Sequence, residues 1–120
     1  MYVDGFVLAL PRRNIEAYKT MSRAAGRVWR EHGAVEYVEA VGNDLKIKKG
    51  MGVSFPRLAR ARAGETVLFS WIAYKSRAHR DRVNKKVMKD PRIASMMNDK
   101  KMPFDVKRMA YGGFKSIVNF

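Results

Sequence analysis

The imidazole of His79 is the side chain best suited to acid–base chemistry, because an unperturbed histidine titrates near neutral pH. His79 repeats at four-residue intervals with Val83 and Val87, so the three side chains share one face of the helix expected after Ser76. We expect that face to turn toward a sheet. The other interpretation is a partly buried structural histidine that hydrogen-bonds a carbonyl or a carboxylate, and both interpretations stay open.

Three carboxylates, those of Asp4, Glu36 and Glu39, lie inside expected strands, where acidic residues are depleted. Asp4 shares its strand face with aromatic residues. It either forms an ion pair with a base such as Arg108 or has a raised pKa that suits catalysis. Glu36 and Glu39 are three residues apart, so they point to opposite faces and only one of them can face a shared pocket.

Aromatic side chains on the strands provide candidate walls for a small-molecule pocket between sheet and helices. The candidates for ligand contact are Trp71, Tyr74, Tyr111 and Arg108. With them, His79 would be the polar centre, oriented by Asp4 and by Glu36 or Glu39. Core or dimer packing explains the aromatic residues equally well.

The pair Gly112-Gly113 lies in the last expected strand, where glycine weakens strand pairing. A β-bulge would explain it. The functional alternative is a floor that lets a ligand or a partner subunit approach the backbone closely.

No metal site or cofactor site is expected. The chain has no cysteine, and its two histidines, His32 and His79, fall on different expected helices. No phosphate-binding loop and no dinucleotide fingerprint is present. Whether the protein is an enzyme stays open.

The net charge of +14, from 25 Lys and Arg against 11 Asp and Glu, attracts anionic partners in general. A nucleic-acid interface would use the basic residues of the loop 45–63 and of the helix after Ser76. These residues are Arg57, Arg60, Arg62, Lys85, Lys86 and Lys89. A dispersed excess of charge is weaker support than one compact stripe, and a solvated basic surface is the alternative.

The expected elements alternate between strands and helices. Strands are expected at residues 2–10, 34–41, 66–74 and 107–118. One helix is expected after the N-cap Asn14 up to Gly33, a second after the N-cap Ser76, and a short third helix after the N-cap Asp90. This order predicts one α+β domain over residues 1–120 with the ferredoxin-like β-α-β-β-α-β arrangement and both long helices on one sheet face. Strands 2–10 and 66–74 are apolar on both sides, so we expect a second copy to cover the open face in a homodimer.

The composition, with 47% hydrophobic residues, is that of a chain able to bury a core. The N-terminal segment lacks the basic region of a signal peptide, and no window approaches the length of a membrane span. We expect a cytoplasmic protein without a membrane partner.

Several stretches resemble the YbaA-like family of short bacterial proteins of unknown function. They are MYVDGFVL at 1–8, EHGAVEYVEAV at 31–41, SFP at 54–56, FSWIAYKSRAHRDRVNKKVMKDPR at 69–92 and MPFDVKRMAYGGFK at 102–115. The resemblance implies a dimeric α/β barrel and no established activity. The loop 45–63 and the helix after Ser76 are more basic here than is usual for the family.

Two functions are therefore predicted as alternatives. The first is a homodimeric small-ligand binder or minor enzyme with a pocket between sheet and helices. The second is a basic, non-sequence-specific nucleic-acid (RNA) binder.

Overall fold

A four-stranded antiparallel sheet organises the protein, whose computed structural model describes residues 1–98 and 101–120. The strands, in the order β2-β3-β1-β4, are β1 (Tyr2–Pro11), β2 (Glu36–Val41), β3 (Glu65–Tyr74) and β4 (Ala110–Lys115). The helices are α1 (Ile15–Glu31), α2 (Phe55–Leu58), α3 (Arg77–Met88) and α4 (Pro91–Met97), with short 3-10 turns at Arg12–Asn14 and Val106–Arg108. The mixed α/β fold is consistent with the predicted ferredoxin-like arrangement.

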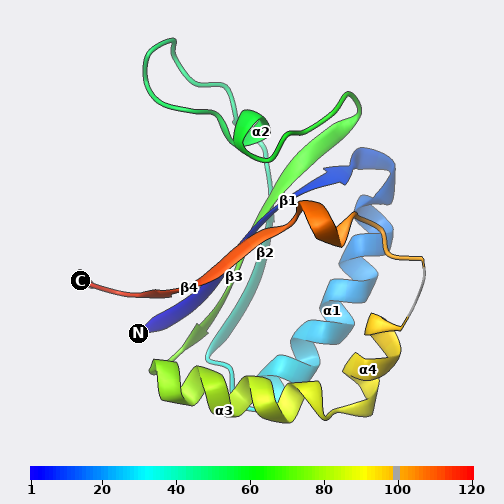
Figure 1. Ribbon diagram of the computed structural model, residues 1–120, viewed down its shortest axis with the longest axis vertical. Helices are drawn as coiled ribbons and strands as arrows, with labels where there is room; N and C mark the ends of the chain where they lie inside the picture. Colours follow the sequence, from blue (N-terminus) through cyan, green and yellow to red (C-terminus); the bar gives the residue numbers. More distant parts are fainter. Residues whose placement is uncertain (99–100) are drawn as a thin grey trace.

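The long helices cover one face of the sheet. Figure 1 shows α1, α3 and α4 together on one side, with α2 near the opposite end of the sheet from α3. Strand alternation decides which side chains meet the helices, and on β1 these are the even-numbered residues from Tyr2 to Leu10. Under α3 the core contains Tyr74, Val83 and Val87, whereas Leu8 belongs to a second cluster under α1. The predicted stripe of the helix after Ser76 therefore does face the sheet.

Helix ends largely follow the sequence signals. Ser76 caps α3 by accepting a hydrogen bond from the amide of His79 at 3.1 Å, and Asp90 caps α4. Gly33 follows α1 with a φ of 115°, a conformation that favours glycine. Asn14 occupies the N-cap position of α1 as expected, but its side chain makes no capping hydrogen bond there, and its amide donates instead to the carbonyl of Pro103 at 2.9 Å.

Two other segments differ from expectation. The last strand is shorter than 107–118, because Asp105 accepts a hydrogen bond from the amide of Lys107 and starts a 3-10 turn there. The loop 45–63 contains the four-residue helix α2, which Ser54 caps by accepting from the amide of Arg57.

The sheet face away from α1, α3 and α4 carries exposed apolar side chains. Phe69 is 45% exposed on β3 and Phe114 is 64% exposed on β4. Helix α2 covers one end of this face, where Phe55 meets Phe69 edge-on with 5.8 Å between ring centroids. Away from α2, Phe114 stays exposed on this face.

Candidate functional site

A buried ion pair joins β1 to α3. Asp4 is only 6% exposed, and its Oδ1 accepts a hydrogen bond from Nη1 of Arg80 at 2.7 Å. Burial raises the pKa of Asp4 above its ordinary value of 3.8, against the lowering effects of Arg80 and Asn84. The expected pairing of Asp4 with Arg108 is wrong, because Arg80 occupies that position.

Asn84 extends this network toward the core. Its Oδ1 accepts hydrogen bonds from Nε1 of Trp29 on α1 and from the hydroxyl of Tyr74 on β3, both at 3.2 Å. Burial raises the pKa of Tyr74, so its hydroxyl stays protonated and acts as a donor. The buried acid is thus held by polar groups from both helices and the sheet.

Arg80 also connects the pair to the surface. Its guanidinium carbon lies 4.9 Å from the ring centroid of Tyr2, and its Nη2 lies 3.4 Å from the Tyr2 hydroxyl. Tyr2 in turn lines a hollow of about 690 Å³ between the start of β1, the end of β4 and the first turn of α3. The hollow is lined by Met1, Tyr2, Lys75, Ser76, Arg77, Ala78, Gly113, Lys115 and Ser116. We name it the α3 hollow.

The glycine pair in β4 forms no bulge. Its register against β1 is continuous, with Asp4 opposite Gly113 and Gly5 opposite Gly112. A Cβ on Gly113 would lie 2.1 Å from the hydroxyl oxygen of Tyr2. The glycine therefore makes room for Tyr2 at the wall of the α3 hollow, a close approach that the bulge interpretation missed.

His79 lies beside this network without joining it. Its Nδ1 accepts a hydrogen bond from the amide of Lys75 at 3.0 Å, and its ring packs edge-on against Tyr74. An accepting Nδ1 leaves the proton of the neutral ring on Nε2. The helix turns about 100° between His79 and Arg80, and this rotation brings Arg80 over Asp4.

Glu39 forms a second polar cluster between β2 and α1. Its Oε2 accepts hydrogen bonds from the hydroxyl of Tyr18 at 2.6 Å and from Oγ of Ser22, which itself lies 2.8 Å from the hydroxyl of Tyr37. Burial raises the pKa of Tyr18 and raises that of Tyr37 to about 12. Oε1 of Glu39 is buried without a hydrogen-bond partner.

The other residues predicted to line a pocket lie on different faces of the sheet, because side chains alternate along a strand. Glu36 lies on the open sheet face, where its Oε1 accepts from Nε1 of Trp71 at 2.6 Å. Tyr74 is buried on the helix side, and Tyr111 is exposed on β4, stacked on Phe6 at 6.0 Å. The predicted walls therefore do not enclose one pocket.

Arg108 serves a different ion pair. It donates to both carboxylate oxygens of Glu65 at 2.9 Å and to the carbonyl of Arg60 at 2.7 Å. This contact lowers the pKa of Glu65 to about 2. Arg108 ties the start of β3 to the turn before β4.

The basic candidates for nucleic-acid binding do not share one surface. Arg57, Arg60 and Arg62 precede β3, whereas Lys85, Lys86 and Lys89 follow it on and beyond α3. A ten-residue strand spans about 30 Å. Figure 1 accordingly places α2 and α3 at opposite ends of the sheet.

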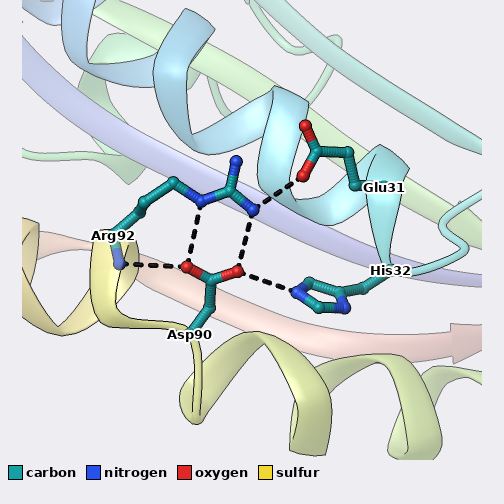
Figure 2. A network of polar contacts seen from close by, with 4 residues as sticks. All are labelled: Glu31, His32, Asp90 and Arg92. Atoms are coloured by element: carbon teal, nitrogen blue, oxygen red, sulfur yellow. Dashed lines mark hydrogen bonds and ion pairs between the residues drawn. The ribbon is translucent and has the colours of Figure 1, made fainter.

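A third polar network, drawn in Figure 2, joins the end of α1 to the junction of α3 and α4. Asp90 accepts hydrogen bonds from Nε2 of His32 at 2.9 Å and from Nη2 of Arg92 at 2.8 Å, and Arg92 also pairs with Glu31. The hydrogen bonds from Arg92 and His32 lower the pKa of Asp90. The sequence showed Asp90 only as a helix cap.

Two negative findings apply to the residues that the structure describes. Among them, no group of three or more His, Cys, Asp or Glu residues could hold a metal ion. No helix in the same residues is long and apolar enough to cross a membrane.

The fold and the site define a small α/β protein with helices over one sheet face and a buried Asp–Arg pair next to a basic hollow. The chain belongs to the family described as protein of unknown function (DUF1428), whose model matches residues 1–106. It is 42% identical over 118 residues to the uncharacterized protein YbaA of Escherichia coli K12 and of Shigella flexneri, covering 98% of this chain and 97% of each relative. The predicted YbaA-like resemblance is confirmed.

Two solved structures share the fold. Protein Atu4242 from Agrobacterium tumefaciens aligns with a TM-score of 0.61 at 17% identity, covering 96% of this chain and 92% of that one. An uncharacterized NIPSNAP domain protein from Burkholderia xenovorans aligns with a TM-score of 0.55 at 10% identity, covering 97% and 94%. At these identities the likeness extends to the fold alone.

Proposed function

We propose that the protein is a small-ligand-binding protein whose binding site is the α3 hollow. The main support is a chain of hydrogen bonds that runs from the buried Asp4 through Arg80 to Tyr2, which lines the hollow. A buried charged pair is costly to build, and it is common where a protein must hold a charge in a fixed place near a ligand. The pair would orient Tyr2, and Tyr2 would contact the ligand.

The proposal assigns binding and no reaction. Asp4 is enclosed by Arg80 and Asn84, so it acts as a positioning residue that reaches the hollow through other side chains. His79 packs edge-on against Tyr74 and holds the turn before α3 by accepting from the amide of Lys75.

The proposed functional unit is a homodimer joined by the open sheet faces. Exposed rings on β3 and β4 supply apolar area, and the one carboxylate on the β2 part of this face, Glu36, is already bound by Trp71. A two-fold axis brings the same patch of both copies together, so the apolar rings of one copy would meet those of the other. Pairing two copies there would bury Phe69 and Phe114 and leave the α3 hollows, which lie on the helix side, accessible.

A thermal-shift screen with sugar phosphates, carboxylates and neutral metabolites tests the binding proposal. A ligand that binds the folded state and not the unfolded state raises the melting temperature, by an amount that grows with the ratio of its concentration to its Kd. We expect at least one class of compounds to do so in the wild type and to lose most of its effect in Tyr2→Phe. Tyr111→Phe is the matched control, because Tyr111 is exposed on the same side of the sheet outside the hollow.

Failure would take either of two forms. If no compound stabilises the wild type, or if Tyr111→Phe weakens the effect as much as Tyr2→Phe, the site is not the α3 hollow. The nucleic-acid alternative would then regain weight, provided that labelled RNA binds and binding survives near-physiological salt. We favour the hollow, because the basic residues of that alternative are divided between two ends of the sheet.

A further inference from the structure

The α3 hollow concentrates positive charge without acidic neighbours in its wall. Three cationic side chains line it, those of Lys75, Arg77 and Lys115, and no Asp or Glu does. None of the three forms an ion pair within the described residues. Two acids close to the start of α3 in space, Asp4 on β1 and Asp81 in the helix itself, are both bound by Arg80. The hollow therefore has unneutralised charge, unlike the ion-paired networks elsewhere in the fold.

The three cationic residues come from three different parts of the chain. Lys75 directly follows β3, and Arg77 is the first residue of α3. Lys115 is the last residue of β4 and lies opposite Tyr2, on the same face of the sheet. Side chains from three directions suit a ligand whose acceptor oxygens also point in several directions. A single cation on one helix would not provide this arrangement.

Neutral donors complete the wall. The first-turn amides of Arg77 and Ala78 have no acceptor in the described residues, since the cap Ser76 accepts from His79 instead. Helix α3 has twelve residues, so its dipole adds favourable potential for an anion at this end. Both amides belong to residues that line the hollow.

The hydroxyl of Tyr2 adds a polar group at the wall of the hollow. Tyr2 is 91% buried, and its oxygen accepts from Arg80, an arrangement that leaves the hydroxyl proton free to be donated. The absence of a side chain on Gly113 lets this oxygen reach the wall of the hollow. Among the described residues the Tyr2 hydroxyl donates no hydrogen bond, and it accepts one from Arg80.

We propose that the α3 hollow binds the phosphate group of a small phosphorylated molecule. Three cations without acidic partners match the charge of a doubly negative phosphate better than that of a singly charged carboxylate. A tetrahedral phosphate also presents oxygens toward donors on several sides. This inference rests on the proposed small-ligand function and specifies its ligand class. The volume of about 690 Å³ leaves room for a small organic group beside the phosphate.

The test is a two-dimensional amide NMR titration of the full-length protein with inorganic phosphate at constant ionic strength. Parallel titrations with sodium acetate and with sodium chloride, in buffers without sulfate, serve as the anion controls. We expect saturable shifts of the Arg77, Ala78 and Gly113 amides with phosphate and much weaker shifts with acetate.

Variants separate the site from the general positive field. Lys75→Gln/Lys115→Gln removes two charges from the hollow and should weaken phosphate binding about tenfold or more, because hydrogen bonds to charged groups are the stronger ones. Lys85→Gln/Lys86→Gln removes two charges from the exposed side of the same helix and should change binding less than about twofold. Tyr2→Phe should weaken binding without a change in net charge.

Equal shifts with acetate, unmoved hollow amides, or equal weakening in both double variants would overturn the inference. If phosphate fails while another compound of the thermal-shift screen binds in the hollow, the ligand class is wrong and the proposed function stands. If neither phosphate nor any compound of the screen binds in the hollow, the inferred ligand class and the proposed function are both wrong.

Discussion

The carboxylate of Asp4 and the guanidinium of Arg80 meet at 2.7 Å although 76 residues separate them along the chain. The contact links the first strand to the helix that follows the third strand. It also brings the start of α3, with Lys75 just before the helix and Arg77 in its first turn, next to β4, so the hollow depends on a long-range ion pair.

Removing one partner of this pair should be costly. Arg80→Ala leaves the carboxylate of Asp4 buried with Asn84 as its remaining polar partner, and we expect a loss of about 3 kcal/mol in the free energy of unfolding at neutral pH. Urea denaturation followed by circular dichroism measures it. Arg82→Ala, an exposed neighbour on α3, should change stability by less than about 0.5 kcal/mol. A similar loss in both variants would contradict the account.

The stability deficit of the same variant should depend on pH. Burial raises the folded-state pKa of Asp4 above the unfolded value of 3.8, and Arg80 opposes that rise. Without Arg80 the pKa rises further, so protonation relieves the buried charge as the pH falls through the folded pKa toward 3.8. The stability deficit of Arg80→Ala relative to wild type should therefore shrink on acidification. A deficit that stays constant from neutral pH downward would contradict this.

Ser22 should be a sensitive position in α1. Its hydroxyl donates to Glu39 and lies within hydrogen-bond distance of Tyr37, so Ser22→Ala removes a donor from a buried carboxylate that already has one unpartnered oxygen. We expect a loss of about 2 kcal/mol in the free energy of unfolding. Thr20→Ala on the exposed side of the same helix is the control, and it should be nearly neutral.

The network of Figure 2 should contribute at neutral pH and fade in acid. Interactions with Arg92 and His32 lower the folded pKa of Asp90, so its stabilisation is present above the unfolded value of 3.8 and is lost as the pH falls toward the folded pKa. Asp90→Asn should lower the melting temperature at neutral pH, and the difference should narrow below that value. Asp44→Asn, in the exposed loop after β2, should show no such difference.

The open sheet face should control self-association. Wild type should sediment at twice 13.8 kDa, and Phe69→Asp should shift the protein toward the monomer because it places a charge on the proposed apolar contact. Met97→Asp on α4 is an exposed control away from that face. A monomeric wild type, or monomers in both variants, would contradict the proposed dimer.

Much of the fold could be predicted from the sequence because the signals are local. Strand alternation separated Glu36 from Glu39, and the caps at Ser76 and Asp90 are short-range patterns. The apolar stripe of Val83 and Val87 likewise identified the buried side of α3.

The partners in the site could not be predicted, because they depend on tertiary distances. Arg80 reaches Asp4 only once α3 crosses the sheet, and one residue along a helix changes direction by about 100°. One usable signal was the spacing of Arg80 and Asn84, a polar pair at four-residue distance beside the apolar stripe. The role of Gly113 was also hidden, because it depends on the reach of Tyr2 from the neighbouring strand.

The central claim, that a small molecule binds in the α3 hollow, is tested most directly by amide NMR spectra of the wild type with mixtures of small metabolites. The account predicts that at least one mixture shifts the amides of Arg77, Ala78 and Gly113 and that Tyr2→Phe weakens these shifts. Spectra in which no mixture moves those amides, or in which Tyr2→Phe changes nothing, would contradict it.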